Sequence, residues 1–187
     1  MLQHNLFCYC GNEPKNRDDR NGNIYIEEGH VVCYGYISEV NCAYTLSAGQ
    51  GLCYDSHGNI AEYVTLIGFD LPGVDIDGFV AGMGMFGVSF GETYTNVKAE
   101  SIDDLVGIGS YVGGSVSLIL SFGYDVITLG KTVADTIEDD VEPSGYQYNW
   151  GLGLGEQWVH VGNSYTYIKY IYKDGREIPK AEQQWIG

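Results

Sequence analysis

The segment Ser115-Val116-Ser117-Leu118-Ile119-Leu120-Ser121-Phe122-Gly123-Tyr124-Asp125-Val126 carries the clearest structural signal in the sequence. Apolar side chains occupy every second position from Val116 to Val126, and serine, glycine and aspartate occupy most of the positions between them. A period of two is that of a β-strand with one buried face. The pattern over 115–129 therefore predicts a half-buried strand.

Other segments repeat this pattern with less regularity. Residues 79–90 alternate, and residues 150–155 place glycines on one face and Trp or Leu on the other. Short β-type runs occur at 24–26, 31–37, 42–46 and 60–69, and a last pair of strands, 157–162 and 165–172, is expected to meet in a tight turn at Gly162-Asn163. Helical signals are confined to Ser101–Leu105, which has the form of a capping box, and to 132–142. The acidic run in 132–142 suits an exposed loop as well as it suits a short helix. We expect an antiparallel all-β fold of about ten to twelve short strands, closed into a barrel or packed as a sandwich.

The 27 glycines and 16 tyrosines of the 187 residues fit such a fold. Gly82-Met83-Gly84-Met85-Phe86-Gly87 matches the letters of a dinucleotide-binding motif, but strand-type sequence follows it where that motif needs a helix. Glycines two apart lie on one face of a strand, where large side chains such as Tyr or Trp can cover the bare backbone. The glycines therefore predict a tightly curved sheet.

The length predicts one domain, with a Cys-bearing segment at 1–23 and a single all-β domain at 24–187. Nine basic against 25 acidic residues leave a formal charge of −16, and no Lys or Arg occurs between Arg20 and Lys98. Nucleic acids and anionic membrane surfaces are therefore poor partners, because both require a basic surface. If the chain has a macromolecular partner bound by charge, we expect that partner to be a basic protein.

The chain starts without the basic and apolar regions of a signal peptide, and no 18 consecutive residues are apolar, so we expect no transmembrane helix. All five cysteines lie within the first 53 residues. They are reduced thiols or form one or two local bridges, and we favour reduced thiols. Export as part of a larger protein or by a dedicated apparatus would also leave the chain without its own signal.

Two stretches resemble a known family. The segment from Gly78 to Gly130, with Thr93-Tyr94-Thr95-Asn96 and Gly113-Gly114-Ser115-Val116-Ser117, resembles the C-terminal Gly-rich β domains of bacterial RHS/YD-repeat polymorphic toxins. Tyr54-Asp55-Ser56-His57-Gly58-Asn59-Ile60 resembles one YD repeat. The resemblance covers about residues 54–170 and implies a secreted effector-like module, but it implies no particular reaction and no catalytic residues.

Metal sites have weak candidates. Asp70, Asp75 and Asp77 have the oxygen density that Ca²⁺ prefers, without the order of an EF-hand loop. Zn²⁺ is the less favoured metal, because Cys8-x-Cys10 is the one close pair among the Cys and His candidates. The remaining candidates are Cys33, Cys42, Cys53, His30 and His57. No cofactor is otherwise indicated.

The last third of the chain is rich in aromatic residues. Trp150, Trp158, Tyr165 and Tyr167 could stack on a sugar or line a ligand cavity. The same side chains could form the interfacial girdle of an outer-membrane barrel, whose strands alternate apolar and small or polar residues. The cysteines, the missing signal and the acidic residues favour a water-soluble domain instead.

The leading functional hypothesis is an effector-like or toxin-like bacterial β domain that acts by binding or by pore formation. The first alternative is a barrel that binds a small ligand or carbohydrate. The second is a hydrolase that uses a Cys/His pair or paired carboxylates, with candidates among Asp103, Asp104 and the acidic run 138–140. No constellation decides whether the chain is an enzyme.

Overall fold

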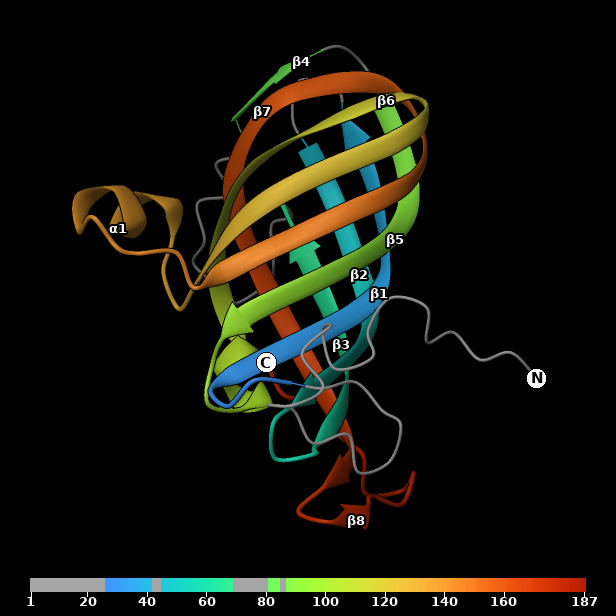
Figure 1. Ribbon diagram of the computed structural model, residues 1–187, viewed down its shortest axis with the longest axis vertical. Coiled ribbons are helices and arrows are strands. Elements are labelled where there is room, and N and C mark those ends of the chain that lie inside the picture. The colour runs from blue at the N-terminus through green and yellow to red at the C-terminus, as the bar shows by residue number, and fades with distance from the viewer. Residues whose placement is uncertain (1–25, 42–44, 69–80, 85–86) are drawn as a thin grey trace, which may run out of the picture.

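The computed structural model describes residues 26–41, 45–68, 81–84 and 87–187. Sequence-based predictions that fall on 1–25, 42–44, 69–80 and 85–86 lie outside the described residues. The predicted Cys-bearing segment 1–23 is one of these. The described chain is all-β, as predicted, with eight strands, one short α-helix and one 3₁₀ turn (Figure 1). The elements are β1 (His30–Asn41), β2 (Thr45–Asp55), β3 (Ile60–Ile67), β4 (Ala81–Gly84), β5 (Gly87–Lys98), η2 (Ile102–Leu105), β6 (Gly107–Leu129), α1 (Val133–Glu138), β7 (Gly145–Lys173) and β8 (Arg176–Glu177).

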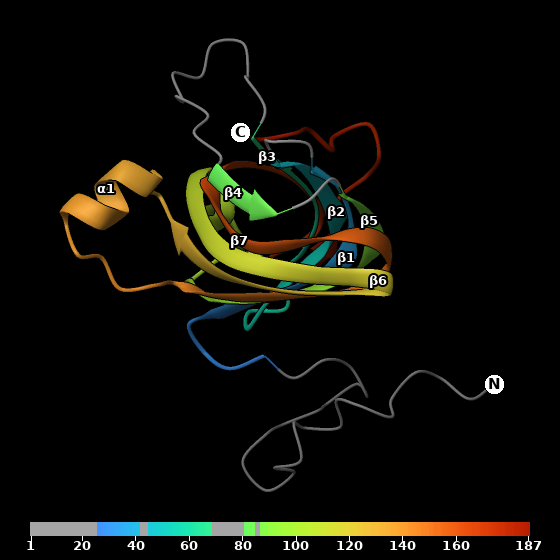
Figure 2. The ribbon, with the colours of Figure 1, turned by 90° about the horizontal axis from the view of Figure 1, so that it is seen from above.

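All strand pairs are antiparallel and belong to one sheet. The pairing runs β3–β2–β1–β5–β7, and a further pairing of β3 with β7 joins the two ends of this path. The strands therefore follow one another round a ring, which Figure 2 shows from above. Fewer strands are present than the ten to twelve expected, because β6 and β7 are long and each bends back on itself (Figure 1).

The bends of β6 and β7 lie side by side at the upper end of the ring in Figure 1. Residues 115–127 of β6 pair with residues 145–157 of β7, and residues 107–113 pair with 160–166. Backbone dihedrals mark the bends at Ile119, with φ 105°, and at Gly155, with φ 106°. The predicted turn at Gly162-Asn163 is wrong: both residues lie within β7, where Gly162 faces the ring of Tyr111.

The hydrophobic core fills the lower end of the ring. Val31, Val97 and Ile168 are completely or almost completely buried there, and η2 contributes Ile102 and Leu105 to the same cluster. The predicted capping box is present, since the Ser101 N–H donates to the Asp104 carboxylate at 3.0 Å. The 3₁₀ turn thus places two apolar side chains where the strands alone leave space.

Tyrosines cover several glycines of the ring. Tyr63 lies over Gly35 and Gly49 on the inner face, and a Cβ at Gly35 would lie 2.7 Å from the Tyr63 Oη. Tyr111 covers Gly162 in the same way. Because glycine has no side chain, these positions leave room for large tyrosine side chains inside the narrow ring of strands.

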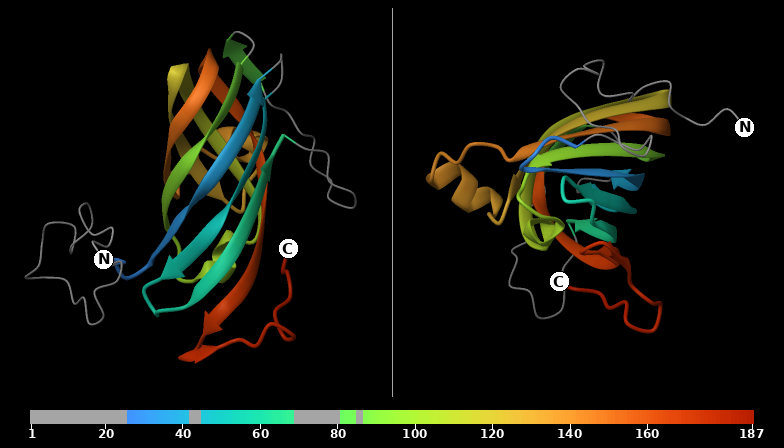
Figure 3. Two further views of the ribbon diagram at one scale, coloured as in Figure 1. Left: turned by 90° about the vertical axis from the view of Figure 1, so that its right-hand side faces the viewer. Right: turned by 60° about the horizontal axis from the view of Figure 1, so that its bottom comes forward.

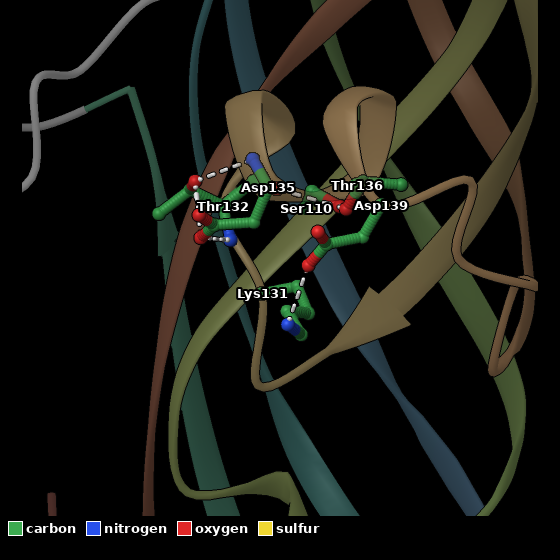
Figure 4. Close-up of polar contacts among 6 residues, drawn as sticks. All are labelled: Ser110, Lys131, Thr132, Asp135, Thr136 and Asp139. Atoms are coloured by element: carbon green, nitrogen blue, oxygen red, sulfur yellow. Dashed lines mark hydrogen bonds and ion pairs between the residues drawn. The ribbon is translucent and has the colours of Figure 1, made fainter.

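Helix α1 lies on the outside of the ring (Figure 3). Its N-terminus is capped by Thr132, whose Oγ1 accepts from the Asp135 N–H at 3.2 Å, and Lys131 pairs with Asp139 at 3.0 Å (Figure 4). A hydroxyl contact of 2.9 Å between Ser110 and Thr136 ties the helix to β6. Asp135 and Asp139 of this segment therefore have structural partners.

Candidate functional site

The outer face of the upper half of the ring is apolar and exposed. Its large side chains come from four strands and expose between 39% and 79% of their surface. Register places them next to one another: Leu154 lies opposite both Val88 and Leu118, and Leu152 lies opposite both Phe90 and Leu120. We call this surface the apolar band; its members are Tyr36, Val88, Phe90, Val116, Leu118, Leu120, Phe122, Trp150, Leu152 and Leu154.

Aromatic contacts join neighbouring strands within the band. Tyr36 of β1 stacks on Phe90 of β5, with ring centroids 6.0 Å apart and planes 1° from parallel. Trp150 Nε1 donates a 3.0 Å hydrogen bond to the Glu92 carboxylate, which lies at the lower border of the band. The indole N–H thus has an acceptor, while the ring remains part of the apolar surface.

A continuous row of tyrosines follows this lower border. Neighbouring ring centroids are 5.1 Å apart between Tyr34 and Tyr94 and between Tyr124 and Tyr148, and at most 6.5 Å apart elsewhere in the row. The row crosses five strands at nearly one level, because Tyr34, Tyr94, Tyr148 and Tyr124 are direct register partners. We call it the tyrosine row; its members are Tyr54, Tyr34, Tyr94, Tyr146, Tyr148 and Tyr124.

The inner face behind the band is polar. Ser117 and Ser121 are buried and share a 2.7 Å hydrogen bond, and Asn149 Nδ2 donates to the buried Asp125 carboxylate at 2.9 Å. Glu39, Ser47 and Thr93 are also buried on this face. The alternation predicted over 115–129 is therefore present, but the serine and glycine face is the buried one and the apolar face is exposed.

Electrostatics inside the ring keep hydroxyl groups protonated. Burial raises the pKa of Tyr111, and the nearby carboxylates of Asp125 and Glu39 raise it further. The same residues line an internal cavity of about 60 Å³ that extends down to Cys33 and Cys53. This volume holds a few water molecules, whereas drug-sized ligands occupy pockets of about 300–1,000 Å³.

The aromatic residues proposed to bind a ligand do not form one site in the described structure. Trp150 lies on the first half of β7 and belongs to the apolar band. Tyr165 and Tyr167 lie on its second half, next to β3, with their rings 5.0 Å apart. The two halves of β6 lie between these locations, and the Trp158 side chain lies outside the described residues.

The metal candidates are only partly described. Asp70, Asp75 and Asp77 lie outside the described residues, as do Cys8, Cys10 and Cys42. Among the residues that the structure describes, no three His, Cys, Asp or Glu side chains gather to hold a metal ion. His30 Nδ1 instead lies 2.8 Å from Asn96 Oδ1, and the His57 N–H donates to Asp55 at 3.0 Å.

Cys33 and Cys53 face each other across β1 and β2, and both are buried free thiols. Burial raises the pKa of Cys53, and the Cys33 side chain raises it further. A high pKa keeps the thiol protonated, which opposes a nucleophilic role. The carboxylate candidates also have structural partners: Asp103 pairs with Lys173 at 3.2 Å, and Asp104 caps η2.

The apolar band is the feature that sequence reasoning missed. The sequence signal for the band was the alternation of apolar and small or polar residues over 115–129. This alternation does not say which face of the strand points inward. The composition of the alternate face was the available clue, because serine and glycine leave room inside a narrow ring while Leu and Phe do not.

Comparison of the chain with protein-family models, with curated proteins and with solved structures finds no match. Within the described ranges, no helix is long and apolar enough to cross a membrane. The geometry of the site therefore carries the functional argument alone.

Proposed function

We propose that the ring is a small β-barrel that binds lipid membranes, with its upper half inserted among the acyl chains and its lower half in water. The observation that carries this proposal is the inversion of the upper half, apolar outside and polar inside. Membrane barrels show this pattern, because their outer face meets hydrocarbon and their inner face does not.

Transfer of the apolar band into lipid would release a large free energy. Full burial of one Leu, Phe or Val side chain is worth about 1.5–3 kcal/mol. The ten members of the band together amount to more than about 10 kcal/mol, even when partial burial is allowed for. The backbone of β1, β2, β3, β5 and β7 adds little cost, because each of these strands has hydrogen-bonded neighbour strands on both sides.

The tyrosine row supports the same orientation. Tyr and Trp gather where a membrane protein crosses the headgroup region, since the ring is apolar and the hydroxyl or N–H remains in contact with water. Here the row borders the band on its lower side, between the apolar surface and the charged lower half.

Several of the acidic residues that argued for a soluble domain lie away from the band. Glu39 and Asp125 point into the ring, and Glu62 pairs with Lys169 at 2.6 Å on the opposite side. Glu92 lies at the border, next to Trp150. Acidic composition is thus compatible with an apolar outer surface above the level of Glu92.

The proposal refines the hypothesis of an effector-like domain that acts by binding or pore formation. Core residues fill the lower end of the ring, and the internal cavity lined by Tyr111 and Asp125 holds about 60 Å³, which argues against an open channel through the described part of a single chain. We therefore favour membrane binding over pore formation by the single chain. A secreted, toxin-like role remains a proposal, and membrane binding would be consistent with it.

Vesicle flotation tests the proposal directly. The full chain is mixed with dioleoylphosphatidylcholine vesicles, and its co-flotation and the Trp emission maximum are measured. We expect co-flotation with a blue shift. The double variant L152S/L154S should lose both, whereas I137S, which changes a 74% exposed side chain on α1, should retain them.

Two outcomes would overturn the proposal. One is wild-type protein that stays at the bottom of the gradient. The other is a stable dimer in lipid-free buffer that L152S/L154S dissociates, because the band would then be an interface between copies of the chain.

A further inference from the structure

The bend of β6 presents two strongly exposed apolar side chains, Leu118 of the apolar band and its chain neighbour Ile119. Leu118 exposes 79% of its surface and Ile119 exposes 70%. Both lie at the upper end of the ring, beside the bend of β7 (Figure 1). Within the part of β6 that follows the bend, this position is the farthest from the tyrosine row, which β6 meets at Tyr124.

Ile119 holds an unfavourable backbone conformation. Its φ of 105° lies in a region that β-branched residues rarely adopt, and β7 places Gly155 at its own bend with nearly the same φ. The Ser117–Ser121 hydrogen bond spans the bend of β6 and does not involve the isoleucine side chain. The chain therefore carries strain to keep an exposed apolar side chain at this point, and strain of this kind is typical of functional positions.

The distance from the tyrosine row to the bend matches one leaflet. Six residues separate Tyr124 from Leu118 along β6, and a strand rises about 3.3 Å per residue, or roughly 20 Å in total. At a tilt of about 40°, this corresponds to a depth of roughly 15 Å, half of a hydrocarbon core of about 30 Å.

Charge indicates the kind of lipid. The charged side chain that register places in the lowest row of the band is acidic, since Glu92 lies between Tyr36 and Trp150. The basic residues Lys169, Lys173 and Arg176 lie on β7 and β8, toward the lower end of the ring. The chain as a whole carries −16. Anionic headgroups would be repelled rather than attracted, so the complementary surface is zwitterionic or neutral.

We infer that the upper end inserts one leaflet deep into a zwitterionic bilayer, with Leu118 and Ile119 at the deepest point and the tyrosine row at the headgroups. This inference rests on the proposed function and adds the depth, the orientation and the lipid class. The residues of the bend act as the inserting tip.

Fluorescence quenching by brominated lipids measures the depth. Variant I119W in a W150F/W158F/W185F background is bound to phosphatidylcholine vesicles that carry bromine at acyl positions 6,7 or 11,12. We expect stronger quenching by the 11,12 lipid. A W158F/W185F variant, which retains Trp150 close to the tyrosine row, should be quenched more by the 6,7 lipid.

A simpler variant protects the test against misfolding. In I119G the strain at φ 105° is relieved, so the fold should be at least as stable, but the vesicle dissociation constant should rise about tenfold for loss of the side chain. Replacing phosphatidylcholine by phosphatidylglycerol should weaken binding, and high salt should reduce that difference.

The outcomes separate the two proposals. Flotation with equal or shallow quenching at position 119, or stronger binding to phosphatidylglycerol, overturns the inference and leaves membrane binding intact. Absence of flotation overturns the proposed function itself. Deep quenching at position 119 together with weaker binding of I119G supports both.

Discussion

The two ends of the ring use the same strands in opposite ways. At the lower end, Val31, Val97 and Ile168 point inward into an apolar core, and the pairs Glu62–Lys169 and Asp103–Lys173 lie on the outside. At the upper end, Ser117, Ser121 and Asp125 point inward, and Leu and Phe side chains point out. The comparison shows that an alternating strand has no preferred inner face of its own. The face that points inward depends on what fills the middle of the ring, and η2 fills the middle at the lower end.

The largest expected effect comes from truncating one apolar side chain at each end. Ile168→Ala removes a completely buried side chain from the core and should lower the free energy of unfolding by about 2–5 kcal/mol. Leu152→Ala, at a 63% exposed position, should change it by less than about 0.5 kcal/mol. Urea unfolding followed by circular dichroism measures both. An equally large loss for Leu152→Ala would mean that the band is packed against another molecule in solution.

Much of the fold could be predicted from local sequence. The alternation at 115–129 and the capping box at Ser101 are present, because each depends on neighbours within a few residues. Of the two alternatives for 132–142, the structure has the short helix. Tyrosine rings lie over bare glycine backbone at Gly35 and Gly162, but the glycines two apart at which such cover was predicted differ, since Gly151 and Gly153 lie against strand backbone and serine side chains.

The candidate site could not be predicted in the same way. The apolar band joins residues of β1, β5, β6 and β7 that are distant in sequence, and its existence depends on which face of each strand points outward. The Gly162-Asn163 turn failed for a related reason. The dipeptide is a good local turn signal, but Gly162 is needed under Tyr111, and Asn163 Oδ1 accepts from the Val133 N–H at 2.8 Å.

The cysteine pair offers a way to strengthen the lower end alone. Cys33 and Cys53 are direct register partners, and Cα atoms of opposite residues in antiparallel strands lie about 4.5–5.5 Å apart, within the range of a disulfide. Oxidation by diamide would join the two sulfurs while the diazene takes up two electrons and two protons. The bridge should raise the free energy of unfolding by about 3 kcal/mol.

Mass spectrometry and thermal unfolding check this prediction. Oxidised protein should lose two hydrogen masses and unfold at a higher temperature, and dithiothreitol should reverse both changes. Since burial raises the pKa of Cys53, oxidation should be slow at neutral pH and faster at higher pH. Cys53→Ser is the control. A wild-type chain that keeps both thiols under oxidising, mildly denaturing conditions would contradict the prediction.

A smaller effect is expected from glycines that curve the sheet. A Cβ at Gly35 would overlap the Gln50 carbonyl oxygen of the neighbouring strand and press on the Tyr63 hydroxyl, so Gly35→Ala should cost about 1–3 kcal/mol. Gly49 faces the same tyrosine with its nearest atoms 3.8 Å away, so Gly49→Ala should be close to neutral. Equal unfolding midpoints for the two variants would show that close strand approach at Gly35 is not required.

The smallest effect at neutral pH, and the most informative about the boundary between the two halves, is expected for Tyr63→Phe. Tyr63 is 6% exposed, and its hydroxyl has no hydrogen-bond partner among the described residues. Removing a buried, unpaired hydroxyl should leave stability unchanged or raise it by up to about 1 kcal/mol at pH 7.

At alkaline pH the difference in stability between the Tyr63→Phe variant and the wild type should grow. Burial, with Cys33 and Cys53 nearby, raises the pKa of Tyr63, so the folded chain keeps this proton while the unfolded chain loses it above about pH 10. Stability of the wild type therefore falls as pH rises past that value, and Tyr63→Phe should move the alkaline unfolding midpoint upward. Tyr36→Phe, at a half-exposed position on the band, is the matched control and should follow the wild type. Thermal melts between pH 7 and 11 measure all three proteins, and coincident curves would show that the Tyr63 hydroxyl reaches water.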